Sequence, residues 1–345
     1  MSPIPSQPKG VLNQDVSFGG VTLVQKTLLA KHLAVMLSSG LTLGEALETA
    51  GETAKGKLAR VLEQVRRRVL AGASLSAALA EHPRVFPPLF INAVFAGESS
   101  GNLAGNLANI AEQLEKDRVL ISKIKGAMMY PAIILVAAFG LGLMLAFVLL
   151  PKLTPLFSGL KMELPWTTRA LIAFGAFIEN DGWQFLIGLV AAIIILIWLG
   201  RRKFTEALRH WVLLKLPGIG PVVRSANLSR FAGSLGLLLK SGVNLDEALE
   251  VTERTLGNYY YRRALRRAAH STIQGTKLSD SLSESTKLFP PLVTRLVRVG
   301  EVSGKFEETL FFLSDFYEGE VDRATKNLST ALEPLLLLGI GLVVA

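Results

Sequence analysis

The sequence has no cysteine, and histidine is scarce, with 4 among 345 residues. The absence of cysteine excludes disulfides, thiol catalysis and cysteine-ligated metal sites. None of His32, His82, His210 and His270 has a second histidine at ligand spacing. No serine lies in the strand–turn–helix pattern of a hydrolase nucleophile. We therefore expect no enzyme active site in this chain.

A complete nucleotide-binding loop is also lacking. Residues 51–58 match the GxxxxGK pattern, but Leu58 stands where a hydroxyl group would hold magnesium. The stretch follows an expected helix rather than a strand, and the second half of the chain has nothing comparable around Gly257. We interpret residues 51–58 as a turn between helices, so that any ATP used is hydrolysed by another protein.

Charge is missing from three apolar segments. Residues 128–150 hold no charged side chain, and their helix of about 34 Å exceeds a bilayer core of about 30 Å. Residues 183–199 form a second uncharged run, at the lower limit of spanning length. A third run follows Pro334 and is still apolar at Ala345, so we expect a third span that is incomplete in this chain. Pro131 and Pro334 are expected in the first turn of their spans, where a missing N–H costs little.

The charges that are present, with a net value of +9, flank these segments. Arg118, Lys123 and Lys125 precede the first run, and residues 201–203 follow the second, whereas loop 151–182 carries both signs. The positive-inside rule places the basic flanks in the cytoplasm and the loop outside. Nucleic-acid binding is the alternative use of a basic surface, but no recognition motif accompanies these residues, so we expect no nucleic-acid partner.

What the chain does contain is one unit of about a hundred residues, present twice. Residues 39–48 return 202 positions later as residues 241–250, and Phe-Pro-Pro-Leu at 86–89 returns 203 positions later at 289–292. The pattern Gly-Glu-x-Ser-Gly recurs in the same way. A duplicated soluble unit, each copy followed by an apolar segment, is typical of a membrane scaffold rather than of a single catalytic pocket.

Each unit is expected to fold as six helices. Gly40 ends a first helix, and Thr42 with Glu45 forms a capping box that opens a second. Further helices are expected over 58–70, after Ser74, from Pro88 to Ala96, and from Leu103 without a break into the first apolar run. No stretch alternates as a strand does. The predicted fold class is therefore all-α, with two homologous six-helix cytoplasmic bundles and three transmembrane helices.

The repeat and the apolar runs also set the expected domain boundaries. In order, these are a flexible tail over 1–20, a first cytoplasmic repeat over 21–127, transmembrane helix 128–150, an external loop over 151–182, transmembrane helix 183–199, a cytoplasmic linker over 200–223, a second cytoplasmic repeat over 224–330 and the start of a third transmembrane helix over 334–345. The tail has no apolar core, so it is not expected to be a secretory signal.

Two acidic residues, Glu45 and Glu98, lie in the recurring motifs. As structural residues, Glu45 would complete the capping box and Glu98 would bond the glycine turn beside it. The alternative is that Glu45, Glu98 and Asn102 bind one Ca²⁺, a cation that prefers oxygen ligands, with water or a neighbouring chain completing the shell. Lys305 replaces Asn102 in the second repeat, so no cation site is expected there. No other cofactor is expected.

Together these motifs resemble those of the type II secretion F family, the platform proteins of type II secretion and type IV pilus machines. The resemblance runs from about Val24 to Ala345. Lys31–Leu41, the two recurring motifs in both halves, and the segment from Tyr130 to Pro151 carry it. It implies two cytoplasmic six-helix domains, three transmembrane helices and homo-oligomers in a bacterial or archaeal inner membrane. In some relatives the first domain carries a divalent cation at acidic positions like those above.

The resemblance further implies partners: a hexameric secretion or pilus ATPase, pilin-like subunits and inner-membrane assembly proteins. The leading interpretation is a non-enzymatic platform that couples the ATPase to pilin assembly in type IV pilus biogenesis or type II protein secretion. Helices bearing Arg66–Arg68 and Arg262–Arg267 are candidate partner faces, or else solvated or lipid-facing surfaces. The alternative is an oligomeric membrane transporter or channel, although the two complete apolar runs contain no charged residue.

Overall fold

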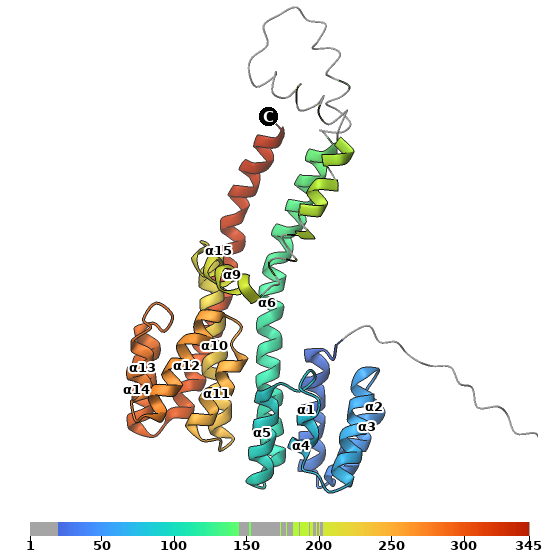
Figure 1. Ribbon diagram of the computed structural model, residues 1–345, viewed down its shortest axis with the longest axis vertical. Coiled ribbons are helices and arrows are strands. Elements are labelled where there is room, and N and C mark those ends of the chain that lie inside the picture. Colours follow the sequence, from blue (N-terminus) through green and yellow to red (C-terminus); the bar gives the residue numbers. More distant parts are fainter. Residues whose placement is uncertain are drawn as a thin grey trace, which may run out of the picture. The chain divides into compact units, whose positions relative to one another are not determined.

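The computed structural model describes residues 20–144 and 203–344, together with single residues and short stretches between 152 and 200. Every regular element in these parts is an α-helix (Figure 1), which confirms the all-α prediction. The predicted tail up to residue 19, the end of the first span from 145 onward, and most of the external loop and second span lie outside the described residues. The predicted domain boundaries stay predictions.

The helices of the first repeat follow the expected order. They are α1 (Leu23–Ser38), α2 (Leu43–Thr53), α3 (Lys57–Leu70), α4 (Leu75–Ala80), α5 (Pro88–Ser99) and α6 (Leu103–Met144). The second repeat matches them with α10 (Ile219–Lys240), α11 (Leu245–Thr255), α12 (Tyr259–Ile273), α13 (Leu278–Ser283), α14 (Pro291–Ser303) and α15 (Phe306–Val344). Before α10 lies a helix that the sequence analysis did not predict, α9 (Lys203–Lys215).

Local capping explains where the early helices begin and end. The Thr42 hydroxyl accepts from the Glu45 N–H, and the Glu45 carboxylate accepts in return from the Thr42 N–H, so the predicted capping box is confirmed. Ser74 caps α4 as expected, by accepting from the Ala77 N–H. Between α1 and α2, Gly40 has φ +89°, a conformation that a side chain would strain.

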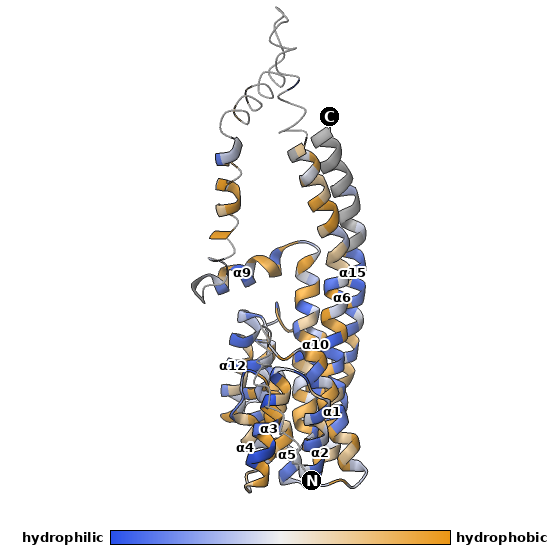
Figure 2. Cartoon of the chain, turned by 90° about the vertical axis from the view of Figure 1, so that its right-hand side faces the viewer, coloured by the Kyte–Doolittle hydropathy of each residue, from blue (hydrophilic) through white to orange (hydrophobic). Residues whose placement is uncertain are grey.

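The last helix of each repeat continues far beyond the repeat. The 42 residues of α6 form one helix, so the predicted absence of a break is confirmed. Its segment Leu103–Gly142 is long and apolar enough to cross a membrane, the one such helix among the described residues. Hydrophobic residues occupy the last part of α6 (Figure 2). The 39-residue helix α15 likewise runs without interruption from the second repeat.

The expected position of the two prolines was wrong. Pro131 lies inside α6 and Pro334 inside α15, rather than in the first turn of a helix. Because each helix already extends from its repeat, the proline removes a backbone hydrogen bond in a helix interior, a place where bends arise. The apolar segments are thus continuations of the last helix of each repeat.

The described chain forms two compact units. The first combines Met1–Arg118 with Leu237–Val251, so the end of α10 and most of α11 belong with the first repeat. The second combines Val119–Gly236 with Thr252–Ala345. In each unit the phenylalanine of the Phe-Pro-Pro-Leu motif is fully buried: Phe86 lies 5.2 Å from Phe90, and Phe289 lies 5.3 Å from Phe231, between ring centroids.

Candidate functional site

The carboxylate of Glu98, near the end of α5, anchors the start of α4. Its oxygens accept hydrogen bonds from the Leu75 N–H, from the Ser76 N–H at 3.0 Å and from the Ser76 hydroxyl. Backbone N–H groups in a first helical turn have no partner within the helix, and a negative charge suits that end of the helix. The sequence analysis suggested the glycine turn beside Glu98 as its structural partner, whereas the carboxylate bonds the start of α4 instead.

The second repeat contains the same anchor. Glu301 in α14 accepts from the Leu278 N–H at 2.7 Å and from the Ser279 N–H at 3.2 Å, at the start of α13. The anchor is therefore present in the repeat that has Lys305 in place of Asn102. The recurrence of this glutamate is explained by the fold of each repeat without any ion.

The glycine before each anchoring glutamate allows two helices to approach closely. A Cβ atom on Gly97 would lie 3.0 Å from the Asn106 Cβ and 3.1 Å from the Leu103 Cα, both in α6. A Cβ atom on Gly300 would lie 3.0 Å from the Phe306 Cα in α15. In each repeat the glycine thus lets the fifth helix pack closely against the sixth. The glutamate that follows it bonds the start of the fourth helix.

The other two residues of the predicted cation site also have structural partners. Glu45 Oε2 accepts from both the N–H and the hydroxyl of Thr42, and these bonds lower the pKa of the Glu45 carboxyl. Asn102 Oδ1 accepts from the Gly105 N–H at 3.2 Å, in the first turn of α6. Each oxygen donor is thus held at a helix start by its own backbone contacts.

No group of three or more histidine, cysteine, aspartate or glutamate side chains lies together for metal binding in the parts of the chain that the structure describes. The predicted site would instead combine two carboxylates with one amide oxygen, those of Glu45, Glu98 and Asn102. Ca²⁺ prefers six to eight oxygen ligands, and both oxygens of Glu98 already accept protein hydrogen bonds. The Glu45, Glu98 and Asn102 calcium site stays a prediction.

If these residues do bind calcium, the ion stabilises the folded protein. The free energy of unfolding should rise by about 2.7 kcal/mol when calcium exceeds its dissociation constant a hundredfold. Glu45→Gln should remove most of that increase, because it deletes an anionic ligand while keeping the shape. The matched control is Glu247→Gln in the second repeat, which should leave the calcium response intact. A melting temperature that ignores both calcium and EDTA would leave Glu45 as a helix cap only.

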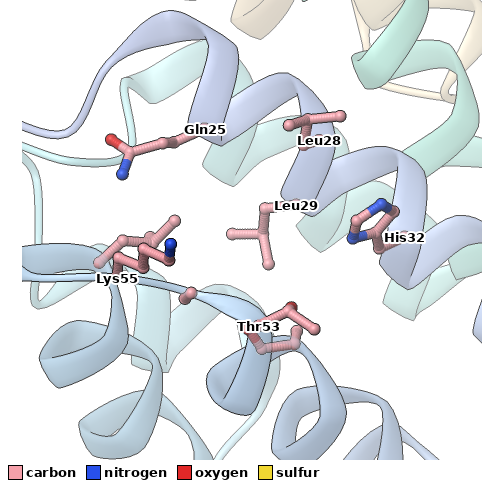
Figure 3. Close-up of a pocket in the computed structure, with 9 residues that line it drawn as sticks. Gln25, Leu28, Leu29, His32, Thr53 and Lys55 are labelled. Atoms are coloured by element: carbon pink, nitrogen blue, oxygen red, sulfur yellow. The ribbon is translucent and has the colours of Figure 1, made fainter.

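The stretch that imitates a nucleotide-binding loop is a turn between helices, as interpreted from the sequence. Thr53 ends α2, and Lys57 begins α3. A cavity of about 220 Å³ lies beside this turn. Figure 3 shows Gln25, Leu29 and His32 of α1 on one side of the cavity, and Thr53 and Lys55 on the other. Because a helix and not a strand precedes the turn, and α1 lines one side of the cavity, the turn lacks the architecture of a phosphate-binding loop.

In the second unit, α6, α10 and α15 meet just before the apolar parts of α6 and α15. Leu120, Val222 and Val321, one from each helix, are buried together. Beside them, Lys123 of α6 donates to Asp322 of α15 at 2.7 Å. This junction joins the two long helices that leave the repeats.

The two basic helix faces differ in how their charges are neutralised. In α3, Arg66 and Arg67 share the Glu63 carboxylate at 3.1 and 2.8 Å, and Arg68 pairs with Glu81. Glu63 of α3 and Glu81 at the end of α4 therefore offset most of the charge of these three arginines.

In α12, Arg262 pairs with Glu206 of α9, and Arg266 pairs with Glu253. Arg263 and Arg267 are exposed, four residues apart, and have no ion pair within the described ranges. Arg263 also lines a cavity of about 470 Å³, together with Arg254, Tyr259 and the acidic residues Glu206 and Glu253. The α12 face therefore retains positive charge on two exposed arginines.

Helix α9 has the composition of a helix at a membrane surface. Leu208 and Trp211 are exposed, and the Lys215 ammonium lies 4.3 Å from the centroid of the Trp211 ring. Exposed apolar residues, tryptophan and basic side chains combine in this way at the boundary between lipid and water. The residues of α9 lie directly after the predicted second span, and their mixture of tryptophan, leucine and basic side chains is visible in the sequence.

Comparison with known proteins agrees with the duplicated architecture. Residues 29–151 and 231–345 each match the family described as type II secretion system (T2SS), protein F. The chain belongs to the type II secretion system protein F family. Both matched regions include a Gly-Glu anchor and a long last helix, so the family resemblance proposed from the sequence is confirmed.

Individual members of the T2SS protein F family are similar over nearly the whole chain. The type IV pilus assembly protein PilC of Thermus thermophilus is 36% identical over 331 residues, 94% of this chain and 80% of that protein. PilC of Myxococcus xanthus is 31% identical over 348 residues, 100% of this chain and 83% of that protein. Type II secretion system protein F of Aeromonas hydrophila is 32% identical over 329 residues, 94% of this chain and 84% of that protein.

Proposed function

We propose that this protein is a non-enzymatic inner-membrane platform that couples a cytoplasmic hexameric ATPase to the assembly of pilin-like subunits. The relatives act, by their names, in type IV pilus assembly and in type II secretion, and both processes fit this role. The observation that carries the proposal is the continuity of α6 and α15, each of which runs from a family repeat into an apolar segment.

Such continuous helices suit the transmission of motion. A displacement of a cytoplasmic repeat moves its last helix as a rod, because the backbone hydrogen bonds of that helix are unbroken except at the proline. The junction of Leu120, Val222 and Val321 joins the rods, so a movement of α15 also displaces α6. An ATPase that pushes on the cytoplasmic face would in this way act on a pilin in the bilayer.

Orientation follows from charge. In this proposal both repeats face the cytoplasm, because basic residues precede the apolar part of α6 and occupy α9. The exposed apolar face of α9 would then lie at the inner surface of the membrane. Several copies of the chain and other inner-membrane assembly proteins would complete the platform.

Removal of the gene from its host tests this role. Cells without the protein should lose their surface filaments, or the secretion of one exoprotein, while the ATPase and pilins remain at normal levels. The unaltered gene should restore the lost process. Normal filaments and normal secretion in the deletion strain would overturn the platform assignment.

A further inference from the structure

The two repeats place the same turn in different surroundings. Residues 39–41 connect α1 to α2, and residues 241–243 connect α10 to α11, with φ of +89° at Gly40 and +91° at Gly242. Val243 is 8% exposed, whereas its counterpart Leu41 is 37% exposed. Because the turns share sequence and backbone conformation, the difference comes from what covers them.

The end of α5 covers the turn of the second repeat. Within the first compact unit, Asn106 Nδ2 donates to the Ser241 carbonyl oxygen at 3.4 Å. A groove of about 270 Å³ lies between the end of α5 and the turn that leads into α11. From α5 and the residue after it, the groove is lined by Phe95, Ala96, Ser99 and Ser100; from the turn and α11, by Ser241, Gly242, Val243, Asn244 and Glu247. The end of α5 is thus a receptor for this turn.

The corresponding receptor on α14 is open. At the positions of Ala96 and Ser99 stand Val299 and Val302, which are 56% and 71% exposed, whereas Ala96 is 9% exposed. At these two positions α14 has larger apolar side chains than α5 has. Water therefore contacts two valines that a turn would cover, and each buried methylene group is worth about 0.8 kcal/mol.

We propose that the end of α14 in one copy of the chain binds the α1–α2 turn, residues 39–45, of a second copy. The α1–α2 turn is the first-repeat counterpart of the turn that α5 already holds, and its Leu41 is exposed. Charge favours the same pairing. In the groove on α5, Phe95 and Glu247 line opposite sides. Their counterparts in the proposed contact are Arg298 and Glu45, which have opposite charges. Arg298 now pairs with Asp280 on the surface, a contact of small energy that a second carboxylate can share.

The contact is heterologous, because it joins different surfaces of the two copies. Each copy keeps one free turn and one free receptor, so the contact repeats and gives either a closed ring or an open chain. It goes beyond the proposed function by naming the surfaces that join two copies, and it can be tested without an ATPase or a pilin.

Cross-linking tests the polarity of the contact. Since the chain has no cysteine, Leu41→Cys and Val302→Cys each introduce a single thiol. When the two full-length proteins, with different tags, are mixed in detergent and treated with a short bismaleimide, mixed dimers should form. Neither variant alone should cross-link efficiently. Absence of mixed dimers, or equal cross-linking of Leu41→Cys with itself, would overturn the proposal.

A second variant tests the receptor without a cross-linker. Val302→Asp in the full-length protein should weaken self-association at least tenfold in sedimentation, with helix content unchanged because the side chain is exposed. The matched control is Ile273→Asp on α12, which replaces another exposed apolar side chain, 65% exposed, outside the receptor. Unchanged self-association in Val302→Asp, or an equal loss in Ile273→Asp, would contradict the proposal.

Discussion

Leu107→Asp is expected to unfold the first repeat. Leu107 in α6 is fully buried, as is Leu62 of α3 in the same compact unit. Removal of a buried leucine side chain alone costs about 2–5 kcal/mol, and a carboxylate without a partner in apolar surroundings adds several more. The total exceeds about 5 kcal/mol, which is most of the stability of an ordinary domain.

Limited proteolysis of the full-length protein in detergent measures this effect. Trypsin should cleave Leu107→Asp rapidly within the first repeat, where lysines and arginines are abundant. Ala108→Asp is the matched control, because Ala108 is exposed one residue further along α6, and it should resist trypsin like the unaltered protein. Equal resistance of the two variants would show that this face of α6 is not part of the core.

Glu98→Gln should be the second most damaging of the changes considered. A glutamine has one carbonyl oxygen in place of the two carboxylate oxygens. Its NH₂ group is a donor, and it would face another donor, an N–H or a hydroxyl group, at the start of α4. Hydrogen bonds to a charged group contribute about 1.5–3 kcal/mol each, and Glu98 makes three. We expect a loss of about 3 kcal/mol, after allowing for the bond that glutamine retains.

The internal repeat supplies the comparison for this variant. Glu301→Gln breaks an anchor of two hydrogen bonds, so it should destabilise the second repeat in the same way but by less. Glu112→Gln removes a carboxylate that is 66% exposed and lies 3.8 Å from the Lys116 ammonium, and it should change thermal stability little. Equal melting temperatures for Glu98→Gln and Glu112→Gln would contradict the anchoring role.

Features that depend on neighbours along the chain were predictable from the sequence. The capping box of Thr42 and Glu45 and the Ser74 cap each depend on residues three apart. Such motifs begin a helix wherever the fold places it. The unbroken α6 was also visible, because nothing between Leu103 and the apolar run interrupts the helical pattern.

Features that depend on tertiary contact were not predictable. Glu98 bonds backbone groups 22 and 23 residues earlier, and no local pattern identifies that partner. The recurrence of Glu301 showed that the position matters but not why. The role of the prolines was misjudged for a similar reason: an apolar run was treated as a separate helix, although the same sequence had indicated that the helix begins at Leu103.

Co-purification from native membranes tests the platform account most directly. If the proposed function holds, a tagged full-length chain should retain a hexameric ATPase, and the purified chain alone should hydrolyse no ATP. Arg263→Glu combined with Arg267→Glu should reduce the retained ATPase, because both side chains are exposed on α12. The matched pair Arg66→Glu and Arg67→Glu, already compensated by Glu63, should reduce it less. ATP hydrolysis by the chain alone, or membranes from which no ATPase is retained, would contradict the account.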